Sequence, residues 1–132
     1  MQGNLVLLGM FVAAITVAQP AVAGDQKLGE KVFRKCKSCH LVGEGAKHKI
    51  GPQLNGLFGR AAGSIDGYKF SKAMLAKSGD GLVWTDETLA AFLTAPKKYV
   101  PGTKMAFPGL KKPADIENLN AYLRNFPEIG SN

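Results

Sequence analysis

The spacing of apolar residues along the chain predicts short helices separated by long loops. Apolar side chains recur every three or four residues within residues 27–35, 85–95 and 114–126, as on a helix with one buried face. The clearest repeat consists of Ile116, Leu119, Tyr122, Leu123 and Phe126. Residues 71–78 predict a further helix, and no segment has a convincing strand pattern. The expected fold class is therefore all-α, with about four short helices.

Polar residues and helix breakers set the expected limits of two of these helices. Ser71 is a candidate N-cap, and Gly79 lies just past the end of its helix. Thr85 is the next candidate N-cap, with two acidic residues following it in the first turn, where the helix dipole favours negative charge. Pro96 ends that helix.

The remaining segments are expected to be loops within a single domain. Residues 37–67 contain seven glycines and Pro52, which is too many breaks for regular structure. Residues 97–113 are predicted to be an extended loop. We find no internal repeat, low-complexity run or change of composition after Gly24.

The N-terminal residues 1–23 have the composition of a targeting segment. They contain no Lys, Arg, Asp, Glu or His, and an apolar run is followed by Pro20 and the small-x-small sequence that ends at Ala23. We expect cleavage after Ala23, export to the periplasm and a mature domain of residues 24–132. The alternative is an uncleaved membrane anchor, because the segment is long enough to cross a bilayer.

The charge of the chain narrows the choice of partners only slightly. All 17 basic and 10 acidic residues lie in the mature domain, which gives it a formal charge of +7. Such a surface attracts nucleic acid, membrane headgroups or acidic proteins, since long-range charge raises encounter rates without selecting a partner. Charge alone is equally compatible with a role in solubility.

The five residues Cys36-Lys37-Ser38-Cys39-His40 form the Cys-x-x-Cys-His pattern of covalent haem attachment. Two thiols on one turn can add to the two vinyl groups of a porphyrin, and the following histidine then lies under the iron. The chain has only two cysteines. The sequence therefore predicts haem c, bound through Cys36 and Cys39 and ligated by His40.

Other interpretations of the cysteine pair remain open at this point. Cys36 and Cys39 could form a disulfide or act as a redox-active dithiol. That second activity is associated with a preceding strand, whereas a helix is predicted here. Zinc fits less well, because His48, the only other histidine, does not have the spacing of a structural zinc site.

The ligand on the other side of the iron separates electron transfer from chemistry on small molecules. Two methionines remain in the mature domain. Met74 lies within a predicted helix and is interpreted as a core residue. Met105 lies in a loop whose proline and glycine restrict the backbone, and it is the predicted ligand, although it could instead pack the loop. With both axial positions filled, an electron carrier is favoured over a peroxidase or a gas-binding protein.

These residues resemble class I c-type cytochromes, in particular the soluble bacterial relatives of mitochondrial cytochrome c. Besides the haem motif, the resemblance rests on Gly29 and Phe33, residues 51–60, Trp84 and residues 96–107. It covers nearly the whole mature domain and implies a small cytochrome c fold wrapped around one haem.

The resemblance also implies roles for individual residues. The Pro52 carbonyl would accept the proton of the His40 ring. Arg60 and Trp84 would donate hydrogen bonds to a buried haem propionate. Gly29 and Phe33 would pack against the last helix near Leu119 and Tyr122. His48 would bridge two loops by hydrogen bonding. Two positions depart from the mitochondrial pattern, since Phe70 and Phe92 stand where that pattern has tyrosines.

The resemblance implies a monomeric one-electron carrier that is not an enzyme and does not bind nucleic acid. Its expected partners are a cytochrome bc-type complex and either a terminal oxidase or a photosynthetic reaction centre, all with acidic docking faces. The lysines that occupy or neighbour the expected ring around the haem edge are Lys35, Lys49, Lys97, Lys98, Lys104, Lys111 and Lys112.

Overall fold

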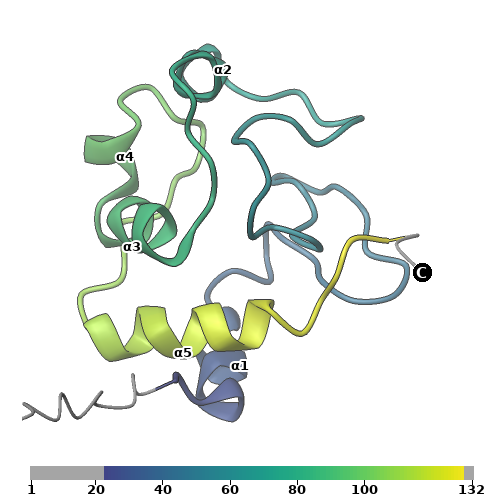
Figure 1. Cartoon of the computed structure of the whole chain (residues 1–132), viewed down its shortest axis with the longest axis vertical. Coiled ribbons are helices and arrows are strands. Elements are labelled where there is room, and N and C mark those ends of the chain that lie inside the picture. Colours follow the sequence, from purple (N-terminus) through teal and green to yellow (C-terminus); the bar gives the residue numbers. More distant parts are fainter. Residues whose placement is uncertain (1–22, 130–132) are drawn as a thin grey trace, which may run out of the picture.

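The computed structural model describes residues 23–129, which form a helical domain with long connecting loops (Figure 1). The helices, in chain order, are α1 (Gln26–Phe33), α2 (Lys72–Gly79), α3 (Asp86–Thr94), α4 (Pro96–Tyr99) and α5 (Pro113–Leu123). The all-α prediction is confirmed. The predicted signal peptide, residues 1–23, lies outside the described residues except for Ala23.

The short helix α4 was not predicted, because residues 97–113 were expected to be loop. Pro96 was interpreted only as the end of α3, but it also occupies the first turn of α4. Proline suits that position, since its fixed φ is helical and its missing N–H needs no partner there. A single residue thus ends one helix and begins the next.

The predicted caps agree with the structure. The Ser71 side chain accepts a hydrogen bond from the backbone N–H of Met74 at the start of α2. Thr85 and Thr88 form a reciprocal capping box at the start of α3. The observed ends of the helices differ from the predicted ones by one to three residues, and Gly79 belongs to α2 instead of following it.

Helices α1 and α5 cross at the base of the domain, so the first and last helices of the described chain pack against each other (Figure 1). Gly29 permits this crossing, because a Cβ atom at that position would lie only 1.9 Å from the carbonyl oxygen of Asn118. The rings of Phe33 on α1 and Tyr122 on α5 also pack against each other, with their centroids 5.4 Å apart. The expected packing of Gly29 and Phe33 against the last helix is confirmed.

Residues 59–62 and 82–84 run beside each other. Within residues 23–129 the structure contains no strand, only the isolated antiparallel bridge between Ala61 and Val83. The N–H of Trp84 donates to the carbonyl of Arg60 at 3.0 Å, and that of Gly59 donates to the carbonyl of Trp84 at 2.8 Å. These bonds bring Arg60 and Trp84 together although they are distant in sequence.

Most of the buried apolar residues line a cavity between α1, α2, α3, α5 and the long loops. The core consists of Val32, Phe33, Leu57, Ala62, Met74, Trp84, Leu89, Phe92, Leu93, Val100, Leu110, Ile116, Leu119 and Leu123. In the part of the chain that the structure describes, no helix has the length and apolar character needed to cross a bilayer.

Candidate haem site

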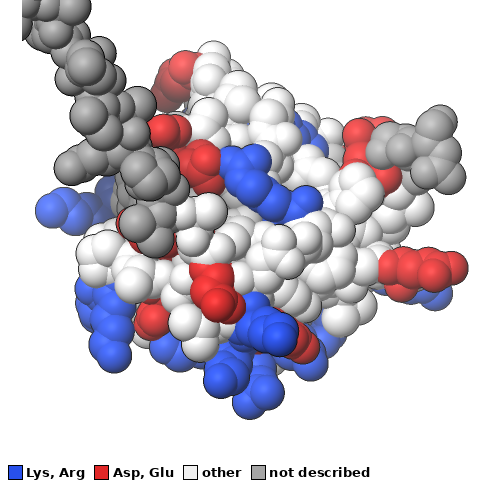
Figure 2. All heavy atoms as spheres, turned by 60° about the horizontal axis from the view of Figure 1, so that its bottom comes forward, with Lys and Arg blue, Asp and Glu red and all other residues white. Residues whose placement is uncertain are grey.

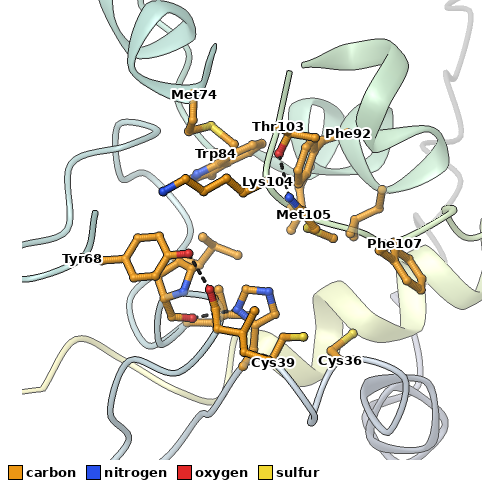
Figure 3. Close-up of a pocket in the computed structure, with 18 of the residues that line it drawn as sticks. Cys36, Cys39, Tyr68, Met74, Trp84, Phe92, Thr103, Lys104, Met105 and Phe107 are labelled. Atoms are coloured by element: carbon orange, nitrogen blue, oxygen red, sulfur yellow. Dashed lines mark hydrogen bonds between the residues drawn. The ribbon is translucent and has the colours of Figure 1, made fainter. Parts of the chain in front are cut away.

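One cavity of about 270 Å³ brings all the predicted site residues together. Its lining includes Cys36, Cys39, His40, Pro52, Arg60, Trp84 and Met105. Figure 3 shows the two cysteines on one side and Met105 with Thr103 and Phe92 on the opposite side. Most other lining residues are aliphatic or aromatic, from α1, α3, α5 and the loops. Such a lining suits a large apolar ligand with a few polar groups.

Local backbone geometry places the two thiols on one turn. Helix α1 leads directly into this turn, where the N–H of Cys36 donates to Phe33 at 2.7 Å. The N–H groups of Cys39 and His40 both donate to the carbonyl of Cys36, at 3.0 and 2.9 Å. The turn therefore presents Cys36, Cys39 and His40 to the same cavity, as attachment of one haem requires.

The chemistry of Cys36 argues against a dithiol oxidoreductase. Both cysteine side chains are partly buried. Burial raises the pKa of the Cys36 thiol to about 11, and the positive charge of Lys35 offsets this only in part. Thiol–disulfide exchange uses a thiolate, and its catalytic cysteines have lowered pKa values. The preceding element is also a helix, in contrast to the strand expected for that class of protein.

His40 has the tautomer needed of a metal ligand. Its Nδ1 donates a hydrogen bond to the carbonyl of Pro52 over 2.7 Å, which leaves Nε2 as the nitrogen able to bind a metal. Burial lowers the pKa of His40, and the bond to Pro52 acts in the opposite direction. The ring is therefore held neutral and in a fixed orientation, with Pro52 in the position that the resemblance implied.

Gly51 and Tyr68 support His40 in ways that the sequence did not reveal. A Cβ atom at Gly51 would lie 2.3 Å from Cε1 of His40, so any side chain there would displace the ring. The Tyr68 hydroxyl donates to the carbonyl of Ile50 over 2.6 Å and helps to hold this loop. Gly51 was noticed only as part of a matching segment, because its steric role depends on a contact across the loop.

Arg60 and Trp84 form a polar part of the cavity wall. Trp84 is 7% exposed and packs against Phe92 at a ring distance of 5.3 Å. Arg60 Nη1 donates to the carbonyl of Asn55 over 2.8 Å. Burial lowers the pKa of the Arg60 guanidinium, while the negative charge of Glu128 raises it. A partly desolvated cation beside an apolar cavity is suited to an anionic group of the ligand.

Both remaining methionines of the mature domain reach the cavity. Met105 is half-buried, and its backbone N–H donates to the Thr103 hydroxyl over 3.3 Å. Met74 is buried, as predicted for a core residue, but it also lines the cavity, beside Trp84 in Figure 3. The sequence did not reveal this second thioether at the site, because a helical pattern shows that a residue is buried but not what it faces.

His48 bridges two loops, as the resemblance implied. Its Nε2 donates to the carbonyl of Asp66 over 2.8 Å, and its Nδ1 accepts from the N–H of Gln53 over 3.1 Å. Both ring nitrogens are therefore used within the protein. This arrangement makes His48 a structural residue that holds the segment containing Pro52.

The residues of this cavity fit a covalently bound haem. They include two thiols on one turn, a neutral imidazole with one free ring nitrogen, and thioethers on the other side. The apolar lining suits a macrocycle, and Arg60 suits its carboxylates. The raised pKa of the Cys36 thiol and the helix that precedes it argue against the main competing interpretation of the motif, a redox-active dithiol.

Comparison with known proteins agrees with this geometry. The cytochrome c family model matches residues 26–127. The chain belongs to the cytochrome c family. Cytochrome c2 of Agrobacterium tumefaciens (strain II Chrys) is 54% identical over 100 residues, which cover 76% of this chain and 90% of that protein. Cytochrome c2 of Blastochloris viridis is 45% identical over 125 residues, which cover 95% of each chain.

The fold agrees as well. The solved structure of cytochrome c2 from Rhodospirillum centenum aligns with a TM-score of 0.75 and 34% identity, covering 80% of this chain and 100% of that one. As a c-type cytochrome, the protein carries covalently bound haem c and transfers electrons. The predicted fold, cofactor and general function are therefore confirmed.

Proposed function

We propose that this cytochrome carries single electrons from a cytochrome bc-type complex to a terminal oxidase or a photosynthetic reaction centre, in the periplasm and without enzymatic activity of its own. In this proposal Cys36 and Cys39 would attach the haem, and His40 and Met105 would ligate its iron. The observation that carries it is the meeting of these four side chains in one apolar cavity, with Nδ1 of His40 already bonded to Pro52.

The protein residues would tune the site in four ways. The haem iron supplies the one-electron ferric/ferrous couple. The bond to Pro52 orients His40 and strengthens it as a donor. A thioether ligand from Met105 favours the ferrous form and raises the reduction potential. Arg60 and Trp84 would compensate the charge of a propionate, and the apolar lining excludes water.

The absence of enzymatic activity follows from the proposed ligands. Peroxidases and gas-binding haem proteins need an open or easily opened iron position. Met105 would occupy that position here, and its backbone N–H donates to the Thr103 hydroxyl over 3.3 Å.

The docking proposal is supported by basic and apolar groups at the cavity mouth. Lys35 and Lys104 line the cavity, and Ile50, also in its lining, is 77% exposed. Figure 2 shows one face of the molecule, on which basic side chains gather toward the lower edge with some acidic side chains among them. This arrangement would attract acidic docking faces and place the exposed edge of the site against them.

Export is proposed from the N-terminal segment. The alignment with Blastochloris viridis cytochrome c2 covers 95% of this chain, so it extends into the apolar residues before Ala23. The intact mass of protein recovered from the periplasm tests this point. We expect the mass of residues 24–132 plus one haem, whereas a membrane-bound chain that retains residues 1–23 would contradict cleavage.

The ligand assignment is tested with Met105→Ala and the matched control Met74→Leu, both as holoproteins. We expect Met105→Ala to lose the long-wavelength methionine-to-iron band of the ferric spectrum and to bind cyanide rapidly. Met74→Leu should keep the band. If Met105→Ala kept it and Met74→Leu lost it, the assignment would be wrong.

Docking is tested with charge reversals of two exposed lysines. The first variant is Lys35→Glu, because Lys35 lies at the cavity mouth. The control is Lys31→Glu, because Lys31 lies on α1 outside the cavity lining. With a purified bacterial bc-type complex, we expect Lys35→Glu to slow the second-order reduction more than Lys31→Glu at low salt. The difference should shrink as salt screens the charges. Equal effects of the two reversals would contradict a docking face at the cavity mouth.

A further inference from the structure

The proposed function leaves unexplained an interaction on the outside of the cavity wall that involves Arg124. Its guanidinium carbon lies 4.0 Å from the centre of the Phe58 ring, which is cation–π geometry. Its Nη2 also donates to Oδ2 of Asp86. One side chain just past the end of α5 therefore contacts two segments that are distant from it and from each other in sequence.

Those two segments carry the polar part of the cavity wall. Phe58 lies two residues before Arg60, and Asp86 lies two residues after Trp84. Between them, backbone hydrogen bonds of 2.8 and 3.0 Å join Gly59 to Trp84 and Trp84 to Arg60. Arg124 therefore contacts both segments on the side that faces away from the cavity, whereas Arg60 and Trp84 of the same segments line the cavity.

A second contact from α5 fixes the orientation of Asp86. Nδ2 of the buried Asn120 donates to Oδ1 of Asp86 over 3.1 Å, so both carboxylate oxygens accept hydrogen bonds from the C-terminal part of the chain. Asp86 is also the first residue of α3, where the helix dipole favours its charge. The carboxylate is thereby held in one place relative to α5.

We propose that Arg124, acting through Phe58 and Asp86, is a positioning residue that keeps Arg60 and Trp84 aligned toward a propionate of the haem. This inference rests on the proposed function, which assigns Arg60 and Trp84 to that propionate. An ion pair whose side chains are about half exposed (49% and 52%) adds little to stability. In this proposal the ion pair sets the position of the two segments relative to each other. The planar guanidinium of Arg124 suits this role, because it can stack on Phe58 and pair with Asp86 at the same time.

The expected consequence of loosening these contacts is a change in reduction potential. If Arg60 and Trp84 move away, the negative propionate is less well compensated, the ferric form is favoured and the potential falls. The propionate then also binds a proton more readily, so the potential varies more steeply with pH. A purely structural contact would lower stability without either effect.

The experiment uses holoproteins with substitutions that preserve charge. Phe58→Leu removes the aromatic face, and Arg124→Lys keeps the charge but loses the planar stacking group. Phe58→Tyr retains the face and serves as the rescue variant. Arg34→Lys, at the exposed C-cap of α1, is the matched control for the arginine substitution. The readouts are the reduction potential as a function of pH and the hydrogen exchange of the Trp84 and Gly59 amides.

We expect Phe58→Leu and Arg124→Lys to lower the potential, steepen its pH dependence and speed exchange of both amides several-fold. Phe58→Tyr and Arg34→Lys should behave like the wild type. Unchanged potentials in both Phe58→Leu and Arg124→Lys would overturn the inference, whether or not amide exchange is faster. Because Arg124 is on the surface, its variant remains informative if Phe58→Leu does not fold.

A separate pair of variants tests the assignment on which this inference rests. Arg60→Lys and Trp84→Phe change the proposed propionate donors directly. If they shift the potential while the Phe58 and Arg124 variants do not, the propionate assignment stands and the positioning role of Arg124 fails. If Arg60→Lys and Trp84→Phe leave the potential and its pH dependence unchanged, the propionate assignment itself fails.

Discussion

The cavity wall that contains His40 is bonded more densely than the wall that contains Met105. On the His40 side, the N–H of Gly51 donates to the carbonyl of Cys39 at 2.9 Å, and Lys49 Nζ donates to the carbonyl of Lys37 at 3.1 Å. The Tyr68 hydroxyl donates to the adjacent carbonyl of Ile50. These bonds link the attachment turn to the loop that follows it. The ring of His40 therefore has little freedom to move.

The Met105 side depends on fewer and more exposed contacts. Within residues 23–129, the backbone of residues 104–109 makes no hydrogen bond to other backbone groups. The N–H of Met105 is bonded to Thr103, and Lys104 Nζ reaches across to the carbonyl of Lys69 over 3.0 Å. Sparse bonding of exposed backbone permits local opening at low cost. We therefore expect the protein to release Met105, the one proposed ligand, more readily than His40, the other.

Removal of the two ligands should have unequal effects, and this is the largest difference that we expect. His40→Ala removes a ligand on the rigid turn, where no nearby loop movement can replace it, so we expect little or no folded holoprotein. Met105→Ala should retain covalent haem, because the attachment turn is untouched. The pyridine haemochrome yield of each purified variant measures this. Equal haem yields would contradict the difference between the two walls.

A smaller effect, a loss of stability, is expected when a larger residue is placed next to the His40 ring. Gly51→Ala would place a methyl group against the His40 ring, and overpacking of this kind costs about 1–3 kcal/mol. We also expect a perturbed His40 signal in the NMR spectrum of the holoprotein. Denaturant unfolding measures the loss of stability.

Gly79→Ala is the matched control for this substitution. Gly79 lies within α2, and a Cβ atom there would meet no other atom within 4 Å. Alanine at a helical position is favoured over glycine by about 0.5–1 kcal/mol, so this variant should be as stable as the wild type or slightly more stable. A similar destabilisation by both substitutions would show that crowding of His40 is not the cause.

The smallest effect is expected from loss of the hydrogen bond between Lys104 Nζ and the carbonyl of Lys69. The Lys104 side chain extends across the cavity in Figure 3. Lys104→Gln should reduce the free energy of unfolding by less than about 1 kcal/mol, since a single exposed hydrogen bond contributes little net stability. The rate of cyanide binding to the ferric protein should nevertheless rise, because the Met105 loop opens more often. Lys98→Gln, on α4, provides a control of equal charge change. Equal cyanide rates in both variants would show that the contact with Lys69 does not restrain the loop.

Local patterns predicted the helices and the attachment turn well, because both depend on interactions within a few residues. The caps at Ser71 and Thr85 act over three residues, and the spacing of Cys36, Cys39 and His40 places them on one turn. Helix α4 was missed for a local reason of a different kind. Pro96 can end one helix and can also begin another, and the sequence pattern does not show that it does both here.

The contacts that complete the site depend on the packing of distant segments. The sequence did not reveal that Gly51 lies against His40, that Met74 lines the cavity, or that Arg124 joins Phe58 to Asp86. A helical repeat predicts that a residue is buried, but its neighbour across the cavity depends on how the loops fold.

The sequence by itself predicted the covalent haem and proposed His40 as a ligand of its iron, because five consecutive residues carry that chemistry. Only the tertiary structure decided how the cavity walls are built and how firmly each is held. That property depends on hydrogen bonds and contacts between segments up to 93 residues apart, such as Asp25 and Asn118. Such pairs form when the chain buries its apolar faces, so no local pattern encodes them individually.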